Sequence, residues 1–145
     1  MRSLKNPVCE KAAGIIESQF KKGNPYVLHL RDAMLSEIDA KIISGSIQLL
    51  QKNRNIRLKS VSVSHNPKIG GGGAIAILGA LPKHIEELGM VGCNLDDSIG
   101  SHIIKFINQS KYLKLVCVED NNFSQKTRLT IGDLKKRKAK CTIVV

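Results

Sequence analysis

Four short apolar runs recur along the chain, each with the pattern apolar-x-x-apolar-x-apolar and an Asn, Cys or Ala three positions further on. Residues 58–66, Leu-Lys-Ser-Val-Ser-Val-Ser-His-Asn, show the pattern most clearly, and the other runs begin at Pro25, Ile85 and Leu113. The central apolar residues of the four runs lie 27 to 33 residues apart and are Leu28, Val61, Leu88 and Val116. Alternating apolar positions are typical of short strands with one buried face, so we predict four strands.

The stretches between the runs carry apolar residues at helical spacing, which predicts a helix after each strand. These residues are Ile38, Ile42, Ile43 and Ile47, then Ile75, Ile77, Leu78 and Leu81, then Ile99, Ile103, Ile104 and Ile107. We interpret Gly70–Gly73 as a flexible turn before a helix over 74–81. Residues 4–22 predict an amphipathic helix that covers the open edge of the first strand. Adding the repeat length to Val116 predicts a fifth strand at 142–145, with Val144 as its anchor.

Strand–helix units at this near-constant spacing resemble the leucine-rich repeat superfamily, most closely its ribonuclease-inhibitor-like branch. Asn66 and Asn121 stand where that family places a ladder of buried side-chain amides, and Cys93 is an accepted variant, whereas Ala33 departs from the pattern. The resemblance implies a short α/β leucine-rich-repeat solenoid with parallel strands on its concave face, helices on its convex face and a helical N-terminal cap.

The length of 145 residues suits one domain with a core of its own, so we treat 1–145 as a single domain. We place the helical cap at 1–24, the repeats at 25–124, and a basic C-terminal helix with a terminal strand or tail at 125–145. A composition of 42% hydrophobic and 24% charged residues indicates a globular rather than a disordered chain. With no Trp, two Tyr and three Phe, the chain is an unfavourable candidate for a base-stacking RNA platform.

The net charge of +11 favours encounters with nucleic acid, anionic lipid or acidic proteins, and much of the excess lies in residues 126–140. The four cysteines lie far apart without a CxxC pair, which argues against a zinc ribbon or a disulfide framework. The sequence shows no secretory signal and no apolar stretch near 18 residues, so we expect an intracellular, cytoplasmic protein. No metal-binding motif is present, and we expect no metal, no cofactor and no small-molecule substrate.

If the strands are parallel and in register, three columns of side chains cross the exposed face of the sheet. The first column holds His29, Ser62, Gly89 and Cys117. The second holds Arg31, Ser64, Val91 and Glu119, and the third holds Asp32, His65, Gly92 and Asp120. The third strand is nearly bare, which favours a shallow patch that accepts a partner's side chain. The alternative, equally open at this point, is that a short repeat array tolerates small residues there.

Asp32 and His65 are expected neighbours, with Ser62 and Ser64 close by, and such groups can form a nucleophile, base and orienting acid. The serines occupy a different strand position from His65, the surface is open, and nothing supplies an oxyanion hole. We therefore expect an exposed Asp32–His65 ion pair rather than catalysis. The Gly70–Gly73 run could present backbone N–H groups to an anion, but it lacks the P-loop ending, so we favour the turn.

The tail from Lys135 to Val145 combines a polybasic run with Cys141 and three aliphatic residues. Prenylation is excluded, because four residues follow Cys141 and the prenylation box allows three. Palmitoylation of Cys141, a PDZ-type ligand at 143–145, and a nuclear-import or anionic-lipid signal stay open. We favour the structural interpretation, in which a solvated helix precedes a final strand.

The resemblance implies a non-enzymatic protein–protein interaction scaffold that binds a partner protein through its concave strand face, as an adaptor or a bacterial effector in the host cytosol. The expected partner-binding residues are Tyr26, His29, Arg31, Ser62, Ser64, His65, Val91, Cys117, Glu119 and Asp120. The alternative is an electrostatic binder of anionic membrane or nucleic acid. It would use Lys135, Lys136, Arg137, Lys138 and Lys140, supported by Lys52, Arg54, Arg57 and Lys59.

Overall fold

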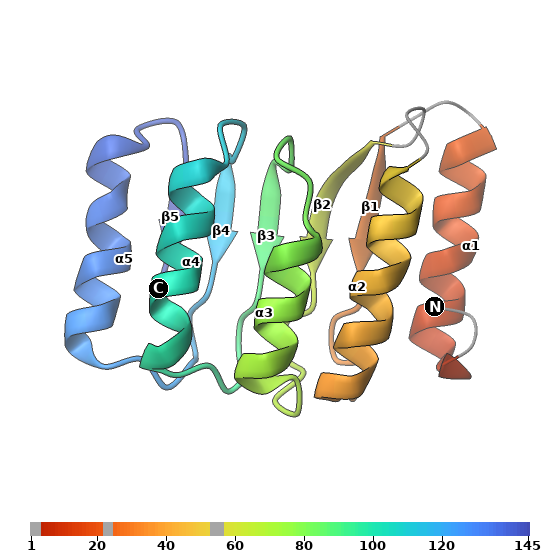
Figure 1. The fold of residues 1–145 in the computed structure, drawn as a ribbon, viewed down its shortest axis with the longest axis horizontal. Coiled ribbons are helices and arrows are strands. Elements are labelled where there is room, and N and C mark those ends of the chain that lie inside the picture. Colours follow the sequence, from red (N-terminus) through yellow and green to blue (C-terminus); the bar gives the residue numbers. More distant parts are fainter. Residues whose placement is uncertain (1–3, 22–24, 53–56) are drawn as a thin grey trace.

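The computed structural model describes residues 4–21, 25–52 and 57–145, which form five helices alternating with five strands (Figure 1). In chain order the elements are α1 (Pro7–Lys21), β1 (Tyr26–His29), α2 (Glu37–Gln51), β2 (Leu58–Ser62), α3 (Gly70–Ala80), β3 (Glu87–Gly89), α4 (Asp97–Gln109), β4 (Leu115–Cys117), α5 (Gln125–Arg137) and β5 (Thr142–Val144). The expected α/β class is confirmed. Arg54 and the neighbouring residues 53, 55 and 56 lie outside the described residues.

The five strands form one open sheet in the order β1-β2-β3-β4-β5, and every neighbouring pair is parallel. Its central register places side by side Leu28, Val61, Leu88, Val116 and Ile143. The four predicted anchors are therefore confirmed, but the fifth is Ile143, which is fully buried, and not Val144, which is 39% exposed. The last unit is one residue shorter than expected, and a shift of one residue turns a strand side chain to the opposite face.

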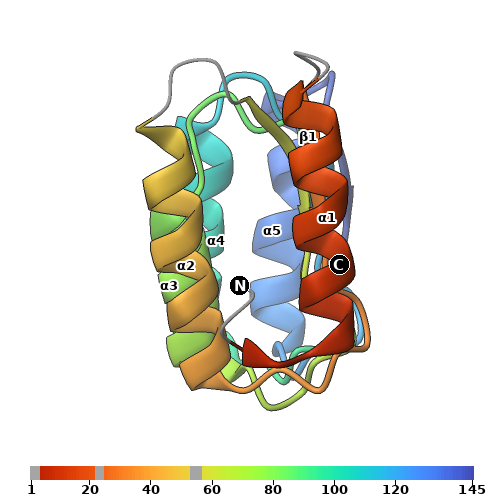
Figure 2. The same cartoon turned by 90° about the vertical axis from the view of Figure 1, so that its right-hand side faces the viewer.

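The helices lie in different positions around this sheet. Helices α2, α3 and α4 form a layer on one face, whereas α1 packs beside β1 and α5 packs beside β5 (Figure 2). The expected helix at the edge of the first strand is thus present, although it begins at Pro7. No helix of the described residues lies on the other face, which we call the open face. The structure shows an α/β fold with one parallel sheet that does not close on itself. The solenoid implied by the resemblance is not shown.

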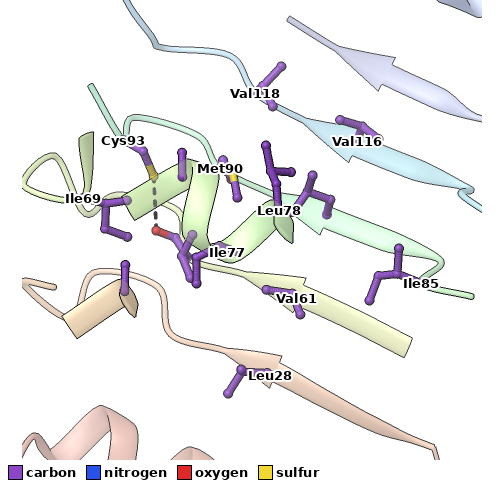
Figure 3. Packing of buried hydrophobic residues seen from close by; sticks show 14 of the residues in the cluster. Leu28, Val61, Ile69, Ile77, Leu78, Ile85, Met90, Cys93, Val116 and Val118 are labelled. Carbon is purple, nitrogen blue, oxygen red and sulfur yellow. Dashed lines mark hydrogen bonds between the residues drawn. The ribbon is translucent and has the colours of Figure 1, made fainter. Parts of the chain in front are cut away.

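The core is aliphatic and lies between the sheet and the helix layer. Leu28, Val61 and Val116 of the strands and Ile77 and Leu78 of α3 belong to one buried cluster (Figure 3). Each of these strand residues is fully buried, as alternation along a strand with one buried face requires. The same alternation sends the intervening side chains to the open face.

Each strand turns into the next helix through a buried hydrogen-bonded loop. The side-chain oxygen of Asn66 accepts the N–H groups of Ala33 and Leu35 at 3.0 and 2.9 Å. Its amide donates to the carbonyls of Leu30 and Val63 at 2.9 and 2.7 Å. Asn66 is fully buried, so these bonds satisfy backbone groups that water cannot reach.

Asn121 repeats this arrangement two strands further along. Its oxygen accepts from the N–H groups of Cys93 and Leu95 at 2.9 and 3.0 Å, and its amide donates to the carbonyls of Met90 and Val118, both at 2.8 Å. At the intermediate position the Cys93 thiol donates to the Val63 carbonyl at 3.3 Å, drawn as a dashed line in Figure 3. The structure therefore contains the predicted ladder of buried side chains, formed by Asn66, Cys93 and Asn121.

The glycine run is not the turn that the sequence suggested, because α3 begins at Gly70 and contains all four glycines. A Cβ on Gly73 would stand 3.0 Å from the Ala40 Cβ, and one on Gly72 would lie 2.5 Å from the Glu37 carboxyl carbon. Small residues are needed there because α2 and α3 approach closely. The first turn of α3 accordingly faces the Glu37 carboxylate of the same chain, which leaves little reason to assign an external anion to it.

Candidate functional site

The first predicted column of the open face is confirmed. Hydrogen-bonded register aligns His29, Ser62, Gly89 and Cys117 on four neighbouring strands. Val144 extends the column onto β5, because Ile143 is the buried anchor of that strand and Val144 pairs with Cys117. His29 is exposed, and Ser62, Gly89 and Cys117 are half-buried, so this column is a surface accessible to a ligand.

The second column also lies in register. Ser64 stands beside Val91, whose N–H donates to the Ser64 hydroxyl at 3.2 Å. The N–H of Gly92 donates to the Glu119 carbonyl at 3.1 Å, which places Val91 beside Glu119. Ser64 is 2% exposed and Val91 9%, so these two residues form the floor rather than the rim of the face.

The third column consists of turn residues. Asp32, His65, Gly92 and Asp120 all have φ between 51° and 59°, the left-handed region that favours glycine. These residues end the strands and start the loops into the helices, so their primary constraint is backbone conformation. Asp120 and Asp32 are nevertheless exposed at the rim of the open face.

The centre of the open face is hollow. A depression of about 230 Å³ is lined by side chains of four strands, and its lining includes His29, Arg31, Ser62, Gly89, Val91 and Cys117. Gly89 is part of its lining, and the Ser62 hydroxyl lies so close that a Cβ on Gly89 would stand 2.8 Å from it. The bare third strand predicted from the sequence thus lies within a hollow of the open face.

Hydrogen bonds hold the side chains around the hollow in place. His29 Nε2 lies 2.9 Å from the Ser60 hydroxyl, and the Ser62 hydroxyl donates to that of Ser64 at 3.1 Å. Arg31 donates to His65 Nε2 at 2.7 Å, a bond that requires this nitrogen to carry no proton. The expected Asp32–His65 ion pair is therefore wrong. Both residues sit in left-handed turns, and the long Arg31 side chain reaches the imidazole across the strands instead.

Tyr26 does not belong to the open face, which corrects its assignment as a partner-binding residue. It is 1% exposed, because strand alternation places it on the same side as Leu28. Its hydroxyl is buried without a hydrogen-bond partner among the described residues, and burial raises the pKa of Tyr26 to about 12. A buried phenol of this kind serves the core and cannot contact a partner.

The thiols are poorly suited to nucleophilic chemistry. Burial raises the pKa of Cys93 to about 11, and burial also raises the pKa of Cys117, the thiol nearest the hollow. A raised pKa lowers the fraction of thiolate, which is the reactive form. No group of three or more His, Cys, Asp or Glu side chains among the described residues is arranged to hold a metal ion.

The C-terminal segment is part of the sheet rather than a free tail. Strand β5 pairs with β4, and Cys141 is 6% exposed, so neither palmitoylation nor a PDZ-type ligand fits this conformation. Lys135, Arg137 and Lys140 are exposed, Lys136 forms an ion pair with Asp133 at 3.0 Å, and Lys138 donates to the Ser110 carbonyl at 3.0 Å. Two of the five expected anion-binding cations thus have partners within the chain.

Within the described ranges, no helix is long and apolar enough to cross a membrane.

A second charged surface escaped the sequence analysis. Lys83, Lys111 and Lys114 lie in the loops that lead into β3 and β4, close to the exposed Tyr112. Lys83 is far in sequence from Lys111 and Lys114, and the three form no basic run. Aligning the segments that precede each predicted strand would have shown that each of them, from Arg57 onward, carries a cation.

Comparisons with known proteins inform the fold of the chain. No family model matches the chain, and no curated protein matches it. A solved structure described as the "Structure of Chaetomium Mex67:Mtr2 subunits" is 18% identical and covers 93% of this chain and 88% of that chain, with a TM-score of 0.56. At this identity the likeness shows a shared fold.

The assignment to the leucine-rich repeat superfamily is corrected accordingly. No family model supports it, and what the structure and the match show is an α/β fold of five parallel strands alternating with helices. The physical reason for the repeated pattern is local. Every parallel strand needs buried alternate residues, and every tight turn into a helix needs a group that satisfies buried backbone amides. Such a pattern identifies a repeated strand–helix unit but does not by itself identify a protein family.

Proposed function

We propose that the protein is a non-enzymatic interaction module that holds a partner protein against its open face. The observation that supports this most strongly is the hollow of about 230 Å³ at Gly89, which lies in the middle of an uncovered sheet. A hollow of this size accepts one side chain, and central side chains seated in pockets supply most of the binding energy of interfaces.

The rigidity of the surface supports the same function. Ser62, Ser64, His29 and Arg31 are already fixed by hydrogen bonds within the chain. A partner that binds them therefore loses little conformational entropy from this side of the interface. The match to a solved structure of subunits agrees with an interaction role.

The charges of the open face indicate what a partner must present. Glu119 has a buried carboxylate oxygen with no hydrogen-bond partner among the described residues, and Asp120 is exposed beside it. Arg31 lies on the opposite side of the hollow. A partner with a hydrogen-bond donor near Glu119 and an acceptor near Arg31 would bond to both the carboxylate and the guanidinium.

The absence of enzymatic activity is part of the proposal. It is supported by the Arg31–His65 hydrogen bond, which occupies Nε2 of the imidazole, and by the raised pKa of Cys117. The proposal also includes an intracellular location, which is supported by four free cysteines, three of them buried. Buried thiols are ordinary in reducing compartments.

A separate function for the basic tail is not adopted. Lys136 and Lys138 are engaged by Asp133 and the end of α4, and β5 completes the sheet. The exposed Lys140 of this segment lies in a loop that enters a strand, as Lys83, Lys111 and Lys114 do.

The test uses the full chain as bait in cell lysate at about 300 mM salt, where weak electrostatic binding is screened. The variant Ser62→Arg fills the hollow, and Ser101→Arg, on the exposed side of α4, is the control of equal size and charge. We expect a discrete protein to be captured by the wild type and by Ser101→Arg, and to be lost with Ser62→Arg. Capture that Ser62→Arg leaves intact, or no capture by a folded wild type, would overturn the proposal.

A further inference from the structure

The two long edges of the sheet carry opposite charge. Because the strands are parallel, all loops that enter strands lie along one edge, the upper one in Figure 1, which we call the strand-start edge. Its exposed cations are Arg57, Lys83, Lys111, Lys114 and Lys140. The loops that leave the strands form the strand-end edge, where the exposed acids Asp32, Asp96 and Asp120 outnumber the exposed cations Arg31 and Lys68. The net charge of the protein is therefore distributed unevenly.

At the strand-start edge, Lys59 and Lys114 flank Glu86. The N–H of Glu86 donates to the Lys59 carbonyl at 2.9 Å, and the N–H of Lys114 donates to the Glu86 carbonyl at 2.7 Å. These three residues therefore occupy neighbouring strands, which are ~4.8 Å apart. Such a row follows the width of the sheet and presents charge along a line.

Little of this charge is neutralised within the described residues. Glu86 is the carboxylate at the centre, and it lies 2.6 Å from Lys114, 3.7 Å from Arg57 and 3.8 Å from Lys59. One carboxylate thus faces three cations. Lys83 and Lys111, which are exposed in the adjacent loops, form no ion pair with any described residue.

Stabilisation of helix ends does not account for Lys83 and Lys111. Cations near a helix C-terminus often offset the partial negative charge of its last carbonyls. Lys138 does this for α4, since its ammonium donates to the carbonyls of Asn108 and Ser110 at 3.4 and 3.0 Å. Lys83 and Lys111 make no such bond within the described part of the chain, so their charge is available to a ligand.

An aromatic ring lies within this row of cations. A depression of about 490 Å³ between the ends of α3 and α4 is lined by Lys83, Gln109, Lys111 and Tyr112. Tyr112 is 57% exposed, although a large apolar ring is usually covered. The depression thus combines two lysines, a side-chain amide and an aromatic ring.

We propose that the strand-start edge binds single-stranded nucleic acid, with Lys83 and Lys111 contacting phosphates and Tyr112 stacking against one base. A linear row of cations suits a linear polyanion, and an exposed ring between them suits an unpaired base. A lipid surface would favour several apolar side chains beside the cations, and Tyr112 is the large hydrophobic side chain exposed in this depression. With one ring, affinity rests mainly on phosphates, so binding should be sensitive to salt and tolerant of sequence.

The first experiment measures binding of a labelled oligothymidylate of about 15 nucleotides by fluorescence anisotropy, between about 50 and 200 mM salt. The variant Lys83→Gln/Lys111→Gln should weaken binding about tenfold at the lower salt. It should also reduce the dependence of log affinity on log salt by about 1.4, since each phosphate contact in a single strand contributes ~0.7. The matched control is Lys68→Gln/Lys126→Gln, which removes two exposed charges elsewhere and should change affinity less than about twofold.

The second variant pair tests the ring. Tyr112→Ala should weaken binding about five- to tenfold without changing the salt dependence, and Tyr112→Phe should bind like the wild type. Equal losses with both double lysine variants would overturn the proposal, because net charge alone would then explain binding. So would preferential binding to duplex DNA or to phosphatidylserine vesicles. Ser62→Arg should bind the oligonucleotide normally, so this proposal and the partner-binding proposal can fail independently.

Discussion

The strand-end edge and the strand-start edge of one sheet are built on different principles. At the strand-end edge, Asn66 and Asn121 are buried and each bonds to backbone groups of two loops. At the strand-start edge, Lys83, Lys111 and Lys114 are exposed, and their principal described contact is the Lys114–Glu86 ion pair. The comparison indicates that one edge holds the fold together while the other is free to be used for binding.

The direction of the chain explains why the division falls this way. Each strand must turn sharply to begin a helix on the covered face, and left-handed residues such as His65 and Asp120 make that turn. The turn leaves backbone amides beneath the surface, and a buried side chain must satisfy them. The return from helix to strand is shorter and lies at the surface, where lysines are tolerated.

The largest effect is expected for Asn121→Ala at the strand-end edge. The substitution leaves the N–H groups of Cys93 and Leu95 and two carbonyls without their partner. We expect the free energy of unfolding to fall by about 3 to 5 kcal/mol, because several buried polar groups lose their bonds at once. Urea denaturation measures this. Asn122→Ala, at an exposed neighbour, is the control and should cost less than about 0.5 kcal/mol.

A smaller effect is expected for Cys93→Ala at the intermediate turn. Cys93 is fully buried, but its thiol makes a single weak bond to the Val63 carbonyl at 3.3 Å and a longer contact to Val91. We expect a loss of about 1 to 2 kcal/mol in the free energy of unfolding, from a small cavity and that bond. If Cys93→Ala cost as much as Asn121→Ala, the buried amides would not be what distinguishes this edge.

A gain of stability is expected for Met34→Gly, also at the strand-end edge. Met34 has φ of 51° and is 84% exposed, so it carries left-handed strain without compensating burial. Glycine should remove a conformational strain energy of about 1 to 2 kcal/mol but should also lose more backbone entropy on folding. The net gain in the free energy of unfolding is about 0.5 kcal/mol. Thermal unfolding should show a higher midpoint for Met34→Gly, while Met34→Ala, which keeps a Cβ, should leave it unchanged.

The smallest effect on stability is expected at the strand-start edge, for Glu86→Gln. A hydrogen bond from Lys114, with Lys59 and Arg57 nearby, holds the pKa of Glu86 below its ordinary value of 4.5. A carboxyl group with a lowered pKa stabilises the fold above its unfolded pKa and loses this contribution as pH falls through its folded pKa. Glu86→Gln should therefore flatten the stability profile below pH 4.5 and change little near neutrality.

Glu86→Gln also tests the difference between the two edges through its effect on oligonucleotide binding. Removing the central carboxylate leaves Lys59, Lys114 and Arg57 without their shared partner. Affinity for oligothymidylate should then rise, with a steeper salt dependence. A large loss of folding stability at pH 7 together with unchanged oligonucleotide affinity would reverse the roles assigned to the two edges.

Much of the fold could be predicted from the sequence because its constraints are local. Alternation identifies Leu28, Val61, Leu88 and Val116, and a buried amide at a fixed distance identifies Asn66 and Asn121. The fifth anchor was misplaced by one residue, at Val144 rather than Ile143, because the unit length varies. The Gly70–Gly73 run was misread because the reason for these glycines is contact with another helix, which no local pattern shows.

The candidate site could be predicted only in part. The open-face column of His29, Ser62, Gly89 and Cys117 follows from register, and so does the hollow at Gly89. Tyr26 was assigned to the wrong face, and His65 was given the wrong partner, because side-chain reach depends on three-dimensional placement. Lys83 comes from a different loop than Lys111 and Lys114, and only the parallel topology brings the two loops together.

The sequential order of the strands has a consequence for how the molecule folds and opens. Each strand pairs only with strands formed by the adjacent units of the chain, so every sheet contact closes a loop of similar, modest length. Contacts of this kind can form one after another from any well-ordered unit, and opening can begin at either end without disrupting the middle. Amide hydrogen exchange should therefore be slowest in β3, which has neighbours on both sides and lies at the centre, and should quicken stepwise toward β5.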